Sequence, residues 1–387
     1  MSSPRPQSRR AFVRTLGVGA AASALTPLVH GRGLEALAAT PGADAALALA
    51  APGVIKLDSN ENPNGPAKAA MSAIVDGLRE ASLYPRDRVA QLRDAVAAAH
   101  GIGGDSVVLG CGSGEVLRMA VLAWCGGGRP LVAAVPTFET PATTAALIKA
   151  EVRGVPVTGD LRLDLDAMAQ AAKGAGMVFL CNPNNPTGTL HPADAIAATI
   201  DRISREAPGT MILVDEAYHE YVTDPRYATA LPQAMARPNV VVSRTFSKIY
   251  GLAGLRVGYA MGQPAAVAQL RQQAVGLNIN QLGALAALAC LERPELVRAA
   301  RDENRTALDF TTREFRRLGY TVADSQANFV LVDLKRDAQP FRDACKAAGI
   351  LVGRAFPPLT THVRISIGTP REMERAMKEF ARILQTA

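Results

Sequence analysis

The residue with the most specific chemistry is a lysine in the segment Thr245-Phe246-Ser247-Lys248. This segment follows the apolar run 240–242, which predicts a buried strand. A lysine at the end of such a strand can keep its amine out of bulk water, which lowers the pKa of the amine and frees a neutral nucleophile. Such an amine forms Schiff bases with carbonyl compounds. The alternative is a surface lysine on a loop, which is where most lysines lie.

A carboxylate ends a second apolar run, in the segment Val214-Asp215-Glu216-Ala217-Tyr218. A buried Asp215 needs a cationic partner. A protonated pyridine nitrogen would serve, because the carboxylate keeps the proton on the ring. Asp215 could equally cap the N-terminus of a helix that follows the strand. Tyr218 can donate a hydrogen bond to a phenolate oxygen, or it can simply pack against its neighbours.

Two other turns have the composition of ligand-binding loops. Cys181-Asn182-Pro183-Asn184-Asn185-Pro186-Thr187-Gly188 follows a third apolar run, and ligands bind at the carboxyl ends of strands in open α/β sheets. Asn185 could donate a hydrogen bond to a ring oxygen there, although Asn-Pro and Thr-Gly are also common in ordinary turns. Gly110-Cys111-Gly112-Ser113-Gly114-Glu115 leaves a strand and opens a helix, which suits a single phosphate. It lacks the spacing of a dinucleotide fingerprint.

These segments require a sheet that brings the ends of several strands together. Short apolar runs alternate with helical stretches such as 193–205, and the runs lie at 107–109, 131–134, 177–180, 211–214, 240–242 and 257–260. Nearly continuous apolar strands predict a mostly parallel sheet that is covered on both faces. The alternation predicts an α/β domain. After about residue 275, long helical stretches and strands at 328–332 and 363–367 predict a second, smaller α+β domain.

The composition excludes several classes of protein. The chain has 387 residues, of which 48% are hydrophobic and 20% charged, so disorder, collagen and coiled coil are excluded. Its formal charge is +7, but much of the excess lies in the first 38 residues, and the remainder carries +3. No basic and aromatic pattern predicts nucleic-acid binding. The five cysteines and five histidines are scattered, so neither a disulfide framework nor a metal site is expected.

The N-terminal segment has the features of an export signal. Ser8-Arg9-Arg10-Ala11-Phe12-Val13-Arg14 precedes a weakly apolar run at 16–29, and small residues recur at 36–39. The paired arginines resemble the twin-arginine signal of bacteria. We therefore expect residues 1–39 to be a signal peptide read by the twin-arginine export machinery, and the protein to be periplasmic or exported. A disordered basic tail on a cytoplasmic protein is the alternative. The run is too short for a membrane anchor.

In their order and spacing, the chemical motifs resemble the fold-type I pyridoxal-phosphate (PLP) aminotransferases of class I/II, and most closely the histidinol-phosphate aminotransferase group. The likeness runs from about residue 55 to the C-terminus. It includes Leu57-Asp58-Ser59-Asn60-Glu61-Asn62-Pro63, Leu83-Tyr84-Pro85, Pro136-Thr137-Phe138 and Arg364-Ile365-Ser366-Ile367-Gly368-Thr369. The resemblance implies a large PLP-binding α/β domain at 76–275, a small α+β domain at 276–387, and an N-terminal arm at 40–75 that contributes to the small domain.

The resemblance also implies how PLP would be held. Lys248 would carry the cofactor as a Schiff base and later move a proton, and Asp215 would pair with the pyridinium nitrogen. Asn185 and Tyr218 would hydrogen-bond the ring hydroxyl oxygen, while Phe138 would stack on the ring. The phosphate would be held by the backbone of Ser113 and Gly114 together with Thr245, Ser247 and Arg256.

Other positions would bind the substrate or the partner subunit. Arg364 would hold the acidic end of the substrate through a bidentate fork, with Asn328 beside it. Tyr84 would reach the phosphate of the neighbouring subunit's cofactor, which implies a homodimer with shared active sites. The family commonly has an arginine directly after Gly-Ile-Leu-Val. This chain has Gly353 there and Arg354 next, so Arg354 is the expected second substrate-binding arginine.

The implied activity is the transfer of an amino group from an amino acid, or an amino phosphate such as histidinol phosphate, to a 2-oxo acid. Two alternatives remain at this point: a PLP-dependent decarboxylase or lyase of the same fold, and a PLP-binding protein without turnover. The family often has a tyrosine where this chain has Phe138, and the stretch Phe356-Pro357-Pro358-Leu359 is also unusual. Export and these differences favour a periplasmic amino acid or an amine-bearing secondary metabolite as the donor.

Overall fold

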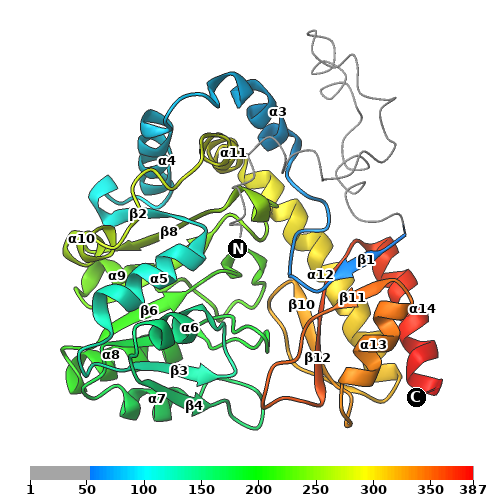
Figure 1. Ribbon diagram of the computed structural model, residues 1–387. Helices are drawn as coiled ribbons and strands as arrows, with labels where there is room; N and C mark the ends of the chain where they lie inside the picture. The colour runs from blue at the N-terminus through cyan, green and yellow to red at the C-terminus, as the bar shows by residue number, and fades with distance from the viewer. Residues whose placement is uncertain (1–52, 387) are drawn as a thin grey trace, which may run out of the picture. The chain divides into compact units, whose positions relative to one another are not determined.

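A computed structural model describes residues 53–386 of the chain. Its largest element is a seven-stranded sheet in the order β2-β8-β7-β6-β5-β3-β4 (Figure 1). The strands are β2 (Val107–Cys111), β3 (Leu131–Val135), β4 (Val152–Pro156), β5 (Met177–Cys181), β6 (Met211–Asp215), β7 (Val240–Thr245) and β8 (Val257–Gly262). Strands β3 to β7 pair in parallel, and β8 runs antiparallel to both of its neighbours. The expected mostly parallel sheet is therefore confirmed.

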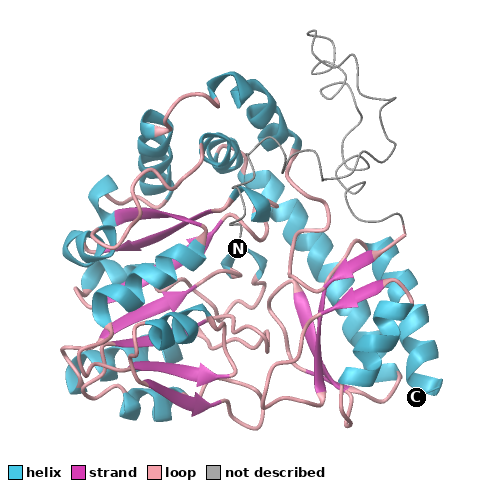
Figure 2. Cartoon of the chain, in the orientation of Figure 1, coloured by secondary structure: helices cyan, strands magenta, loops and turns pink. Residues whose placement is uncertain are grey.

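Both faces of this sheet are covered by helices. Along β5, Val178 and Leu180 belong to one buried apolar cluster, whereas Met177 and Phe179 belong to another. Because successive side chains of a strand point to opposite faces, the two clusters are the two sides of the sheet. The covering helices are α5 (Ser113–Trp124), α6 (Thr140–Leu147), α7 (Leu165–Ala171), α8 (Ala193–Glu206), α9 (Leu231–Ala236) and α10 (Pro264–Arg271) (Figure 2).

Strand β4 is the one member of the sheet without a counterpart among the apolar runs of the sequence. It lies at the edge, and four of its five residues are at least partly exposed. An edge strand has one unpaired side and needs no continuous apolar run, so periodicity could not reveal it.

A second sheet system builds the small domain. Strands β9 (Thr321–Val322), β10 (Phe329–Asp333) and β12 (His362–Ser366) pair antiparallel, and β1 (Ile55–Leu57) pairs in parallel with β11 (Ile350–Val352). The helices α12 (Pro294–Arg317), α13 (Gln339–Ala347) and α14 (Pro370–Thr386) pack on these strands. Their shared core contains Phe315, Phe341 and Phe380. The first strand of the described chain thus joins a domain made almost wholly from its last third.

Three helices form a separate layer, namely α3 (Lys68–Gly77), α4 (Arg86–Ala99) and α11 (Gln281–Leu291). Gly77 allows α3 to approach α11 closely, since a Cβ at this position would collide with Leu285 Cδ1. The buried face of α11 joins the core of the large domain through Ala284, Ala287 and Cys290. The core of the large domain thus includes residues of α11, and α12 is the first helix after residue 275 that contributes to the core of the small domain.

The short 3₁₀ helices η2 (Leu78–Glu80), η3 (Gly104–Ser106), η4 (His219–Tyr221) and η5 (Ala253–Leu255) complete the described elements. No helix within residues 53–386 is both long enough and apolar enough to cross a membrane. The same residues contain no cluster of His, Cys, Asp and Glu side chains that could hold a metal ion. The expected signal peptide at 1–39 lies outside the described residues.

The parallel strands β5, β6 and β7 end in polar residues at one edge of the sheet. Strands β5, β6 and β7 end at Cys181, Asp215 and Thr245, and adjacent strands pair in register. The loops that carry the chemical motifs therefore start side by side, although more than sixty positions separate the first of these ends from the last.

Candidate active site

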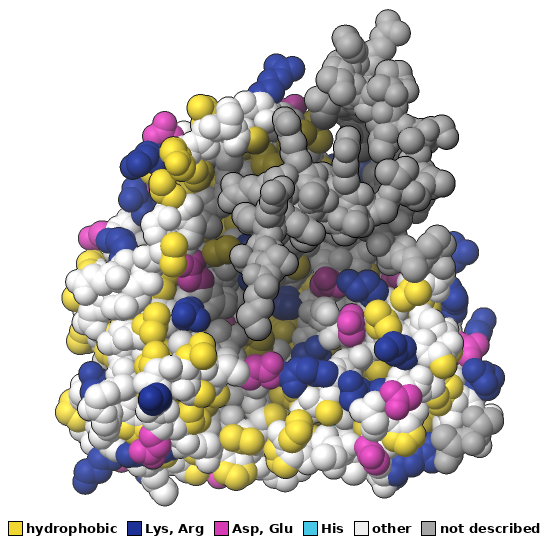
Figure 3. All heavy atoms as spheres, in the orientation of Figure 1, with side chains coloured by type: hydrophobic (Ala, Val, Ile, Leu, Met, Phe, Trp, Pro, Cys, Tyr) yellow, Lys and Arg dark blue, Asp and Glu magenta, His cyan; other side chains and the backbone are white. Residues whose placement is uncertain are grey.

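A cavity of about 730 Å³ lies where the strand ends of the large domain face the small domain. Its wall is formed by Asp58, Ser59, Asn60, Glu61, Ser113, Gly114, Thr137, Phe138, Glu139, Thr140, Cys181, Asn185, Asp215, Ala217, Tyr218, Thr245, Ser247, Lys248, Ala253, Arg256, Arg342, Val352, Arg354, Phe356 and Arg364. Both basic and acidic side chains surround the hollow at the centre of the face in Figure 3. The cavity thus has the size and polarity of a small-molecule site.

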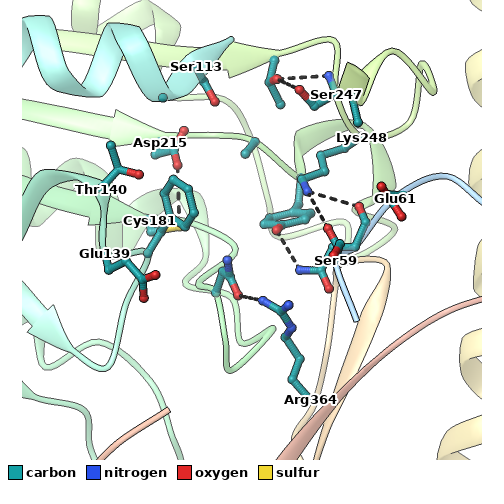
Figure 4. Close-up of a pocket in the computed structure, with 18 of the residues that line it drawn as sticks. Ser59, Glu61, Ser113, Glu139, Thr140, Cys181, Asp215, Ser247, Lys248 and Arg364 are labelled. Carbon is teal, nitrogen blue, oxygen red and sulfur yellow. Dashed lines mark hydrogen bonds between the residues drawn. The ribbon is translucent and has the colours of Figure 1, made fainter. Parts of the chain in front are cut away.

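Lys248 projects into this cavity from the loop after β7 (Figure 4). Its Nζ donates hydrogen bonds to the backbone carbonyl oxygens of Asn60, at 3.2 Å, and of Ser59, at 3.3 Å. Burial and, after it, the nearby positive charge of Arg364 together lower the pKa of Lys248 to about 8. About a tenth of this lysine is therefore a neutral nucleophile at pH 7, far more than for an ordinary lysine.

Asp215 faces the same space from the end of β6 and is 2% exposed. Its Oδ1 accepts a hydrogen bond of 2.8 Å from Ser243 Oγ, while the nearest donor to Oδ2 is Cys181 Sγ at 3.9 Å. Burial raises the pKa of Asp215 to about 6. One side of this carboxylate therefore lacks the cation or strong donor that a buried carboxylate requires.

An anion site lies at the N-terminus of α5. Gly112 precedes the helix with a φ of 75°, and no side chain caps the free backbone N–H groups. Arg256 lies against this turn so closely that a Cβ on Gly112 would collide with its Nη2. Arg256 Nη1 also lies 3.4 Å from Ser247 Oγ, which accepts a 2.9 Å hydrogen bond from Thr245 Oγ1. Free N–H groups, a guanidinium and two hydroxyls favour a phosphate.

Arg364 reaches the cavity from β12 of the small domain and is 8% exposed. Its Nη1 donates to Asn185 Oδ1 at 2.8 Å and its Nη2 donates to the carbonyl of Asp58 at 2.6 Å. Its Nε is buried without a hydrogen-bond partner in the described part of the chain. The guanidinium is thus fixed in orientation, and its buried Nε–H is left without an acceptor.

The cavity brings together nearly all of the expected cofactor and substrate residues. Two of them lie elsewhere. Asn328 is 1% exposed and does not line the cavity, because its Nδ2 donates to the backbone carbonyls of Asn60 and Glu61. It supports the segment that faces Lys248 and does not itself face the cavity. Tyr84 is 78% exposed and lies outside the wall of this cavity.

The sequence motifs did not reveal every residue of the site. Asn60 has a left-handed φ of 55°, and its Nδ2 donates to Tyr218 Oη at 3.0 Å. Its carbonyl also accepts from Lys248, so one residue of the N-terminal arm orients two groups of the large domain. Its place in the motif at 57–63 was the available signal. Glu139 and Arg342 also line the cavity and carried no motif that marked them, whereas Phe356 begins the unusual stretch at 356–359.

Comparison with known proteins gives the family. The model of the aminotransferase class I and II family matches residues 52–380. The chain belongs to this aminotransferase family. This aminotransferase is 38% identical over 324 residues to the histidinol-phosphate aminotransferase of Symbiobacterium thermophilum, covering 83% of this chain and 88% of that protein. It is 36% identical over 338 residues to the aromatic amino acid aminotransferase of Nocardia farcinica, covering 84% and 91%.

A solved structure gives the same answer for the fold of this aminotransferase. The crystal structure of histidinol-phosphate aminotransferase from Sinorhizobium meliloti in complex with pyridoxal-5'-phosphate superposes with a TM-score of 0.81 at 25% identity. The match covers 93% of this chain and 95% of that one. The fold is that of fold-type I PLP aminotransferases, and the reaction is PLP-dependent transamination. The residues of the cavity also fit this cofactor chemically. The unpaired side of Asp215 is complementary to a pyridinium, and the anion site at α5 is complementary to a phosphate.

Proposed function

We propose that this aminotransferase acts on donors with one anionic end, either an amino acid or an amino phosphate such as histidinol phosphate, and transfers their amino group to a 2-oxo acid. The unpartnered Nε of Arg364 carries this proposal, because a buried guanidinium whose Nε–H has no acceptor calls for an anion. The relatives named above act on histidinol phosphate or aromatic amino acids by their names, and both substrate classes have a single acidic end.

In this proposal, different residues of the cavity have different roles. Lys248 would hold the cofactor covalently and move the proton at the donor's α-carbon, and Asp215 would hold the pyridine nitrogen. Asn185 and Tyr218 would contact the ring oxygen, Phe138 would cover one face, and the phosphate would lie on Ser113, Gly114, Thr245, Ser247 and Arg256. PLP supplies an electron sink for the bond broken at the α-carbon.

The experiment is an absorbance titration of the full-length, PLP-loaded protein with single amino donors. The panel contains histidinol phosphate, histidine, phenylalanine and two amines that have no anionic group. We expect the band of the lysine-bound cofactor to convert to the aminated form with one or more anionic donors and with neither amine. Carbon dioxide release or donor fragmentation without amination would favour a decarboxylase or lyase. Equal conversion of the amines that have no anionic group would refute the requirement for an anion.

The pKa of Lys248 gives a pH prediction. Capture of PLP by the cofactor-free protein needs the neutral amine, so its rate should rise about tenfold per pH unit below the pKa and level off above it. We expect the midpoint near pH 8, because burial lowers the pKa of Lys248 to about 8 from an ordinary value of 10.5. Stopped-flow absorbance measures the rate. A midpoint near the ordinary value would show that this amine is not desolvated.

We also propose a homodimer with shared active sites. Met71, Leu78, Leu83 and Tyr84 are exposed large side chains on or beside α3 and η2, and Tyr84 is 78% exposed. Exposed apolar side chains close together on one surface are typical of an association site. Sedimentation equilibrium tests the oligomer. A protein that stays monomeric at micromolar concentration would contradict it.

Finally, we propose export through the twin-arginine route. Support comes from the paired Arg9 and Arg10, the apolar run and the small residues at 36–39. This route suits an enzyme that folds around its cofactor before transport. A reporter fused to residues 1–40 should appear in the periplasm of a bacterial host, and its Arg9→Lys/Arg10→Lys variant should remain in the cytoplasm. Retention of the unmodified fusion in the cytoplasm would refute export.

A further inference from the structure

The mouth of the cavity is crossed by an ion pair between the two domains. Glu139 directly precedes α6 of the large domain, and Arg354 follows β11 of the small domain. Arg354 Nη2 donates to Glu139 Oε2, and Arg354 Nη1 donates to the carbonyl of Ala355 at 2.8 Å. Their side chains are 50% and 51% exposed. Both line the cavity that contains Lys248.

Arg354 and Arg364 therefore differ in the positive charge that they can offer to a ligand. Arg364 is buried, and its terminal nitrogens donate to an amide oxygen and a backbone carbonyl, which are neutral acceptors. Arg354 is half exposed and pairs with the carboxylate of Glu139. Phe356 lies against both guanidinium groups, with its ring centre 4.3 Å from Arg354 Cζ and 4.9 Å from Arg364 Cζ. The ring is 5% exposed and stabilises both cations while keeping them apart.

Backbone packing fixes the position of the arginine that pairs with Glu139. Gly353 N donates to the carbonyl of Arg364 at 2.8 Å, and a Cβ at Gly353 would lie 2.6 Å from that carbonyl oxygen. A side chain does not fit at 353 without a shift of β12, so the guanidinium is carried by the next residue. Arg342, which also lines the cavity, donates to the carbonyl of Gly353 at 2.9 Å and to Gln339 Oε1 at 2.7 Å.

We propose that Glu139 and Arg354 form a charge filter, which favours ligands whose far end is neutral or cationic over ligands with a second anionic group. The inference rests on the proposed binding of the first anionic end at Arg364. A second anion beyond it would meet the carboxylate of Glu139, and the charge of Arg354 is already compensated by that carboxylate. Like charges a few ångströms apart repel, and this costs most where water is partly excluded.

The test compares two ligands that differ only in charge at the far end. Glutarate has a carboxylate there, and its monoamide, glutaramate, has a neutral amide of the same shape. Calorimetry on the full-length, PLP-loaded protein gives both affinities without turnover. We expect glutaramate to bind about tenfold more tightly than glutarate. In Glu139→Gln, which releases Arg354, we expect the preference to reverse by about tenfold or more. In Arg354→Gln, the preference for glutaramate should increase.

An exposed acid elsewhere provides the matched control. Glu151 pairs with Arg153 at 3.2 Å outside the cavity wall, so Glu151→Gln should keep the wild-type preference. If both ligands bind and their ratio in Glu139→Gln equals the wild-type ratio, the filter is refuted while the anion site at Arg364 stands. If neither ligand binds and no anionic donor is converted, the proposed function fails and the filter fails with it.

Discussion

Replacement of Lys248 by alanine is expected to lower the rate of transamination by at least about 10³-fold, the largest effect of any single substitution in this site. The variant loses both the amine that attaches the cofactor and the base that lies within reach of the donor's α-carbon. The Nζ of Lys248 is the only lysine amine in the wall of this cavity among the described residues, so no neighbouring lysine can replace it. Single-turnover absorbance with the best anionic donor measures the loss.

The same variant separates catalysis from binding. Without Lys248, PLP should still bind through Asp215 and the anion site at α5, but it should be removable by dialysis. Lys173→Ala serves as the control, because Lys173 is exposed and lies outside the cavity wall. If the cofactor remained fixed in Lys248→Ala and the donor reacted at the wild-type rate, another amine would have to be the nucleophile.

Most of the large domain was predictable from the sequence because its strands are buried on both faces. A run such as 177–180 has to be apolar at every position, and such runs give both the strands and their parallel arrangement. The exposed edge strand β4 gave no such signal. Helix α11 was also ambiguous, since an Ala-rich and Leu-rich helix looks alike in either domain. Its assignment depends on which neighbours it contacts.

The candidate site divides in the same way. Asp215 ends a buried strand, and Lys248 and Asn185 lie in the loops that follow two others, so their place at one sheet edge follows from local sequence and general rules. The ion pair of Glu139 and Arg354 joins positions 215 residues apart and depends on how the two domains meet. The contacts of Asn328 likewise depend on tertiary structure. This residue lies beside Arg364's strand as expected, but its amide turns to the backbone of Asn60 and not to the cavity.

The second large effect is expected on stability and concerns the residue after Asp215. Glu216 and Arg244 form a buried ion pair of 2.8 Å between the ends of β6 and β7, with side chains 1% and 5% exposed. Glu216 also accepts from Thr229 Oγ1 at 2.8 Å and from the backbone N–H of Ala230 at 2.7 Å. Both carboxylate oxygens therefore have partners, which is the condition under which a buried charge is tolerated.

Glu216→Gln keeps the shape of the side chain but removes the carboxylate that contacts the buried guanidinium of Arg244. We expect the free energy of unfolding of the cofactor-free protein to fall by about 3–5 kcal/mol, as for other buried pairs that lose one partner. Urea denaturation followed by circular dichroism measures the change.

The control is Glu206→Gln, which breaks an exposed pair with Arg202 and should change the free energy by less than about 0.5 kcal/mol. If the two variants were equally stable, the predicted contribution of the buried pair to stability would be refuted. If Arg244→Met/Glu216→Leu recovered stability but not cofactor binding, the pair would serve to position β6 and β7 for the site more than to stabilise the fold.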